Sequence, residues 1–321
     1  MVPADGRLVE LVKSGRLTGV RTAGAVFVSA PGSASAGELR IAHGGDGVCI
    51  FRQTNRCAIH TQAGELALPV SCRHYPRVIL RDSVNTRISL SHYCPTAASM
   101  LFATGDIEIA DAAGRLTVDE PIEGLDARDA LPPLLRPGML TDLDGYNAWE
   151  LCCVATLARE GDARSALDVI GRATETLRTW KPIDGKLVDR VEAAFDDARR
   201  RPAQTRTWDV HMGSEIIRSL ASSPLHTVDG DPVRLSTDLE RVVANYVAAR
   251  VFGNWISYQG RGLRTIVAWL HACHDTVRAF LQNEKAVTPA SLLSAVRNAD
   301  LLMLHTVDSQ AFARAAVILE T

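Results

Sequence analysis

Residues 131–138 read LPPLLRPG, and the character of the sequence changes across them. Three prolines and a glycine oppose both a helix and a central strand, so the segment predicts a linker or a domain edge. Short β-rich runs precede it, and longer runs with apolar residues at helical spacing follow it. We therefore expect an α+β protein, predominantly α, with a loop- and β-rich part at residues 1–130 and a helical domain at residues 139–321.

The first part contains short β-rich runs, most of them bounded by turn-forming residues. Strands are predicted at residues 24–30, 38–42, 77–82 and 86–92, and a hairpin at residues 106–120.

The second part contains runs whose apolar residues recur every three or four positions. Helices are predicted at residues 142–161, 162–180, 184–201, 236–256, 262–282 and 288–305. Thr288 followed by Pro289 is typical of a helix start. A region of this length suits a helical bundle.

The composition is that of a globular protein, with 46% hydrophobic and 22% charged residues. The formal net charge of -2 provides no basic field for nucleic acid or an anionic membrane. No run reaches the roughly 18 apolar residues of a membrane helix, and residues 1–7 lack the apolar core of a signal peptide. We expect a cytoplasmic protein, in which thiols stay reduced.

Four of the seven cysteines lie close together in the sequence, at Cys49, Cys57, Cys72 and Cys94. Thiolate is a soft, anionic ligand, and four thiolates complete a tetrahedral zinc site or hold an iron–sulfur cluster. No Cys-x-x-Cys pair occurs, so the spacing of zinc ribbons and fingers is not matched. The alternative is four buried cysteines that act as small apolar side chains. Spacing alone leaves both interpretations open.

The segment from Cys49 to Cys94 also contains short motifs in a fixed order. They are Cys49-Ile50-Phe51, Cys57-Ala58-Ile59-His60, Gly64-Glu65-Leu66-Ala67-Leu68, Cys72-Arg73-His74-Tyr75-Pro76-Arg77 and Cys94-Pro95. In order and spacing this series resembles the flagellin lysine-N-methylase family, which belongs to a wider group of cysteine-cluster proteins that chelate zinc or iron. The family normally has an earlier cysteine element as well, whereas residues 1–48 contain no cysteine.

The resemblance implies that the four cysteines bind zinc or an iron–sulfur cluster. It also implies methyl transfer from S-adenosylmethionine to a protein lysine, with a flagellin-like protein as the substrate. Because the earlier cysteine element is missing here, one alternative is a non-enzymatic scaffold, stabilised by zinc or iron, that binds a protein partner. Another is an enzyme of a different class on the same metal-binding scaffold.

Cationic and phenolic side chains accompany Cys72. Arg73 would place a guanidinium beside clustered thiolates, which lowers the cost of their negative charge. We expect Arg73 to contact the bound cofactor or substrate. Tyr75 is a second candidate for this role, although packing in the core is the favoured interpretation for it. Three histidines near the cysteines are further candidate ligands, although a lone histidine is more often a surface residue: His60, His74 and His92.

The other cysteines are expected in apolar helices, outside the metal site: Cys152, Cys153 and Cys273. His271 and His274 share a helical face, but no third ligand is close in sequence, which favours an ordinary core or surface role. No phosphate-binding loop, dinucleotide fingerprint or nucleophile elbow occurs. The sequence identifies no catalytic base beyond the candidates Glu65 and Tyr75.

Overall fold

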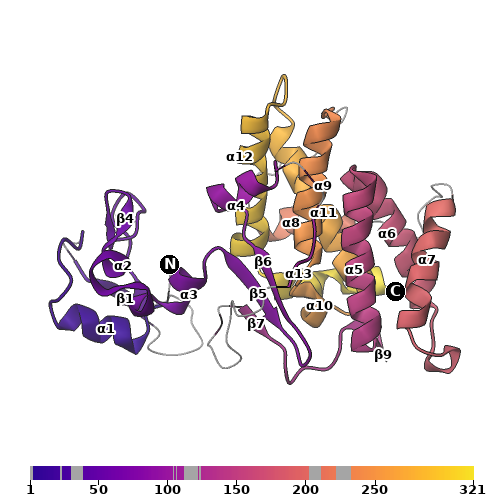
Figure 1. The fold of residues 1–321 in the computed structure, drawn as a ribbon, viewed down its shortest axis with the longest axis horizontal. Helices are drawn as coiled ribbons and strands as arrows, with labels where there is room; N and C mark the ends of the chain where they lie inside the picture. Colours follow the sequence, from indigo (N-terminus) through magenta and orange to yellow (C-terminus); the bar gives the residue numbers. More distant parts are fainter. Residues whose placement is uncertain are drawn as a thin grey trace. The chain divides into compact units, whose positions relative to one another are not determined.

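The computed structural model describes residues 3–21, 24–29, 39–103, 105, 107–111, 122, 124–201, 211–221 and 233–321. Across these residues the fold is α+β and predominantly α-helical, which confirms the predicted class (Figure 1). The chain divides into two compact units. The first is Met1–Tyr75 with Leu116–Glu123, and the second is Pro76–Arg115 with Gly124–Thr321.

The division between the units differs from the boundary expected at residues 131–138. It falls between Tyr75 and Pro76, inside the motif that begins at Cys72. The proline-rich segment instead contributes a strand to a small hairpin of β8 (Leu134–Arg136) and β9 (Met139–Leu140). Leu135 in that hairpin is fully buried in the helical core, so the segment belongs to the second unit and does not link two domains.

The first unit is built from short elements around a small apolar core. In chain order they are α1 (Gly6–Lys13), β1 (Phe27–Ser29), β2 (Leu39–Ile41), β3 (Arg52–Gln53), β4 (Arg56–Cys57), α2 (Ala58–Ala63), η1 (Glu65–Ala67) and α3 (Val70–His74). β1 pairs antiparallel with β2, and β3 with β4. Leu8, Ile50 and Phe51 lie in the core and are at most 1% exposed. The strands predicted near residues 24–30 and 38–42 are confirmed in shortened form, whereas the helices of this unit were not predicted.

A three-stranded sheet opens the second unit. Its order is β6 (Thr86–Leu90), β5 (Arg77–Arg81) and β7 (Gly124–Asp126), with β6 antiparallel and β7 parallel to β5. A side chain at Gly124 would approach the Ile79 carbonyl oxygen to 2.3 Å, so the close pairing of β7 requires glycine. Both predicted strands are confirmed. Most of the hairpin predicted at residues 106–120 lies outside the described residues, and residues 107–111 form no strand.

Helices make up the rest of the second unit. They are α4 (Pro95–Met100), α5 (Leu143–Glu160), α6 (Ala163–Arg178), η2 (Pro182–Asp184), α7 (Val188–Arg200), α8 (Met212–Ala221), α9 (Thr237–Val251), α10 (Ile256–Gln259), α11 (Leu263–Leu281), α12 (Pro289–Asp300), η3 (Leu301–Thr306), α13 (Ser309–Ala315) and η4 (Ala316–Glu320). All six predicted helices are present. Local sequence sets their starts: the Asp142 carboxylate accepts a hydrogen bond from Gly145 N, and Thr288 caps α12 ahead of Pro289.

Two helices form the centre of this bundle. α11 packs against α6, α8, α9 and α12, and α9 also packs against α5 (Figure 1). Apolar residues therefore occur on nearly every face of α9 and α11, including Tyr246 and Trp269. The sheet is tied to these helices through Trp255, whose indole N–H donates to the Ile79 carbonyl at 3.1 Å. The bundle thus holds the strands, and the loop after β6, in place.

Candidate metal centre

Cys49 and Cys57 lie near one another in the first unit, where Cys49 precedes β3 and Cys57 is the last residue of β4. The backbone of Cys49 forms an isolated antiparallel β-bridge with His43. In the hairpin, Cys57 lies opposite Arg52. Both thiols are half-buried. The hairpin turn holds Thr54 at a φ of 52°, a left-handed conformation that is uncommon for a β-branched residue. The backbone therefore keeps this turn at some conformational cost.

The Cys57 thiol contributes to the pKa of the Cys49 thiol. Burial raises the pKa of the Cys49 thiol above its usual range, and the neighbouring Cys57 thiol raises it further. A positive ion between them would reverse this effect, because a bound metal stabilises the thiolate form. Among the residues that the structure describes, no three His, Cys, Asp or Glu side chains gather as a metal-binding group. The structure thus brings two of the four cysteines that were predicted as ligands near one another.

Cys72 belongs to the same unit and lies within α3, half-buried. Arg73, which follows it, is also half-buried, and His74 is only 2% exposed. Tyr75 is 46% exposed, so its expected packing in the core is wrong. The reason is local: Tyr75 is the residue at which α3 ends, and its backbone N–H bonds back to the Ser71 carbonyl at 3.0 Å. Its phenol is accessible to a ligand.

Cys94 belongs to the second unit, where it caps the start of α4 ahead of Pro95. The loop before it is fixed by the rear helices. Asp300 accepts hydrogen bonds from Ser91 Oγ at 2.9 Å and from Tyr93 N at 3.0 Å. Arg297 Nε donates to the Tyr93 carbonyl at 3.1 Å. These hydrogen bonds hold in place the turn that precedes the half-buried Cys94.

The candidate histidines differ in environment. His60 is exposed on α2, whereas His92 is 3% exposed and contacts the Tyr246 ring edge-on. Burial lowers the pKa of His92 to about 3, and the nearby Arg250 guanidinium contributes to the shift. His92 is therefore an uncharged side chain inside the second unit.

The remaining cysteines lie in helices, as expected. Cys153 and Cys273 are fully buried, and burial raises the pKa of each thiol. Cys152 is half-buried on α5. His271 and His274 on α11 are each 3% exposed, so both lie in the interior of the bundle.

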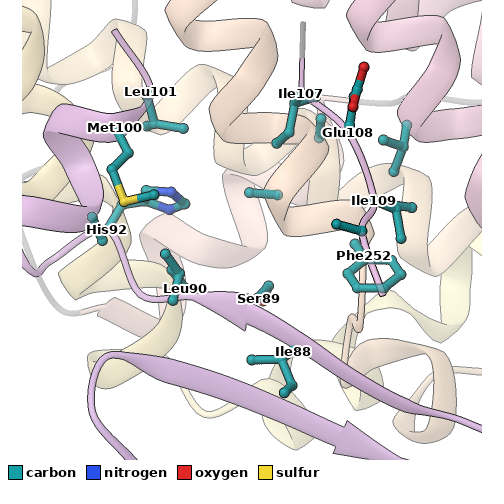
Figure 2. Close-up of a pocket in the computed structure, with 15 residues that line it drawn as sticks. Ile88, Ser89, Leu90, His92, Met100, Leu101, Ile107, Glu108, Ile109 and Phe252 are labelled. Atoms are coloured by element: carbon teal, nitrogen blue, oxygen red, sulfur yellow. The ribbon is translucent and has the colours of Figure 1, made fainter. Parts of the chain in front are cut away.

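The second unit also contains a pocket of about 300 Å³, which was not predicted from the sequence. Its wall is assembled from β6, α4, the stretch 107–110, α5 and α9 (Figure 2). Apolar side chains predominate, among them Leu90, Leu101 and Phe252. His92 lines the pocket too. Among the residues that line the pocket, His92 is the one that the sequence analysis names as a functional candidate, as a possible metal ligand.

Comparisons with protein-family models, with curated proteins and with solved structures return no match. Across the described residues, no helix has the length and apolar character needed to cross a membrane.

Proposed function

We propose that this protein binds a zinc ion or an iron–sulfur cluster through Cys49, Cys57, Cys72 and Cys94. The observation that supports the proposal is the proximity of two half-buried thiols, Cys49 and Cys57, of which Cys57 helps to raise the pKa of Cys49. Thiols at such a position are reachable from solvent yet partly desolvated, which suits a soft metal. A bound metal would supply a cross-link between loops that otherwise contain little secondary structure.

The activity proposed for this metal protein is methyl transfer from S-adenosylmethionine to a protein lysine. The support is the motif series that resembles flagellin lysine-N-methylases. Arg73 and Tyr75 are the side chains proposed to contact the cofactor, and the exposure of Tyr75 is compatible with that role. The attacking amine must first lose its proton, for which Glu65, exposed on η1, is a candidate acceptor. A cytoplasmic location forms part of the same proposal, because it keeps the thiols reduced.

The test combines metal analysis with a transfer assay. Protein purified without oxygen should carry either one zinc per chain or iron with acid-labile sulfide and visible absorption. Incubation with labelled S-adenosylmethionine and a flagellin-type protein should then label lysine. A metal-containing protein that labels no lysine would favour the scaffold alternative. A folded protein without stoichiometric metal would contradict the metal site itself.

A further inference from the structure

The pocket in the second unit contains a buried polar atom that the fold does not satisfy. Nδ1 of His92 is buried and has no hydrogen-bond partner within the described residues. In Figure 2 the His92 ring lies between Leu90 and Leu101, within the wall of the pocket. A buried polar atom without a partner destabilises the folded protein, so a molecule that fills the pocket and hydrogen-bonds to this nitrogen would recover stability.

The rest of the wall sets the character of such a molecule. Glu108 is the charged side chain among the lining residues, and it is exposed, with its carboxylate directed away from His92 (Figure 2). The other side chains are apolar apart from Ser89 and His92. A charged ligand would lose hydration here without gaining an ionic partner from the wall, whereas an uncharged apolar ligand would bury its surface favourably.

The volume of the pocket limits the size of the ligand. A dry apolar cavity of about 150 Å³ takes up benzene, so the 300 Å³ here accommodates roughly twice as many atoms. This is the lower end of the range for small-molecule sites.

We propose that this pocket is a binding site for a small, uncharged, mainly apolar molecule of about the size of a bicyclic aromatic, which hydrogen-bonds to Nδ1 of His92. The proposal goes beyond the metal site, since all its residues belong to the second unit and none is one of the four cysteines proposed to bind the metal. Nδ1 of a neutral imidazole donates or accepts according to its tautomer, so the ligand carries the complementary group.

Three nearly isosteric probes test the proposal on the intact chain: indole, which donates; benzothiazole, whose ring nitrogen accepts; and indene, which does neither. Binding is measured by calorimetry and by ligand-observed nuclear magnetic resonance. We expect either indole or benzothiazole to bind roughly 3- to 10-fold more tightly than indene, the size of one net hydrogen bond. His92→Phe, which keeps a ring at this position, should abolish that preference.

Two further variants test whether the probes bind in this pocket. Ala249, on α9, lines the pocket, so Ala249→Leu should weaken all three probes at least 10-fold by filling the space. Ala193→Leu, on an exposed position of α7, should leave binding unchanged. Failure of all probes to bind, equal binding of all three to the wild type, or unaltered binding by Ala249→Leu would each overturn the proposal. The wild-type comparison decides the outcome even if His92→Phe does not fold.

Discussion

Arg87 and Glu150 form a buried ion pair that fastens the sheet to the helical bundle. Nε of Arg87 on β6 donates to Oε2 of Glu150 on α5 at 2.7 Å, and both side chains are at most 4% exposed. Arg87 also pairs with Asp82 at 2.5 Å, while the other oxygen of Glu150 accepts from Gly253 N at 3.0 Å. Every partner in this network lies in the second unit, and removal of Glu150 leaves the buried Arg87 with Asp82 alone and the buried Gly253 N without its acceptor.

Glu150→Ala should therefore destabilise the protein by roughly 3–5 kcal/mol, measured by urea unfolding. The loss should be much larger than the effect of replacing an exposed acid such as Glu284. A variant that combines Asp82→Asn, Arg87→Met and Glu150→Met should recover part of the lost stability, because no charge of the network is then left alone. Equal stability of Glu150→Ala and Glu284→Ala would show that the network contributes nothing.

Glu320 anchors the last turn of the chain to the bundle. Its fully buried side chain accepts hydrogen bonds from Thr265 N at 2.8 Å and Thr265 Oγ1 at 2.9 Å, and it pairs with Arg178. We expect Glu320→Ala to lower the free energy of unfolding by about 3 kcal/mol or more, since Arg178 then remains buried without its partner. Gly262→Ala should also destabilise, because the added Cβ would come within 2.3 Å of Glu320 Oε2.

Asp275 makes stability depend on pH. Burial alone would raise the pKa of this carboxyl, but hydrogen bonds from His211, His274 and Ser214 hold it well below its usual range. A carboxyl with a lowered pKa in the folded state stabilises the protein above its unfolded pKa of about 3.9, and this stabilisation is lost as the pH falls below that value. Urea midpoints at pH 7, 4 and 3 should show the loss in the wild type.

The matched variants isolate this effect. Asp275→Asn should be less stable at pH 7 and should show a smaller further loss between pH 4 and pH 3. Asp129→Asn, at an exposed turn, should follow the wild-type profile. If Asp275→Asn loses stability on acidification as steeply as the wild type, this carboxyl is not the source of the dependence.

Arg73 is predicted to support the proposed metal centre. An anionic thiolate centre needs nearby donors, and loss of such a neighbour typically weakens metal affinity by about 10- to 100-fold. We expect Arg73→Ala to reduce metal retention without unfolding the helical bundle, and Arg77→Ala to have a smaller effect. Metal content and thermal unfolding of both variants provide the measurement. The reverse order of effects would assign the role to Arg77 instead.

The helices of the second unit were predictable because their apolar spacing and end signals agree. α11 begins and ends within one residue of the predicted 262–282, and Thr288 caps α12 as its sequence indicates. α2, α3 and α4 are at most six residues long, too short for a periodic signal, and depend on tertiary packing. α1 was missed although Asp5 offers its N-cap signal.

The candidate site was only partly predictable, for a different reason. Spacing identifies Cys49 and Cys57 as candidates, and the hairpin places them near one another. The pocket, in contrast, is lined by residues that are far apart in the sequence, such as Leu90 and Phe252. The order of residues along the chain does not show which of them will face one another across a pocket. Likewise, the prolines near residues 131–138 mark a turn, but the burial of Leu135 in the bundle follows from packing.

Metal content of cysteine variants tests the central claim most directly. Cys49→Ser and Cys57→Ser, purified without oxygen beside the wild type, should each lose most of the bound zinc or iron by elemental analysis. Cys152→Ser, a half-buried cysteine of α5, should retain it in full. Wild-type metal content in Cys49→Ser and Cys57→Ser, or loss of metal in Cys152→Ser, would contradict the assignment of the metal centre.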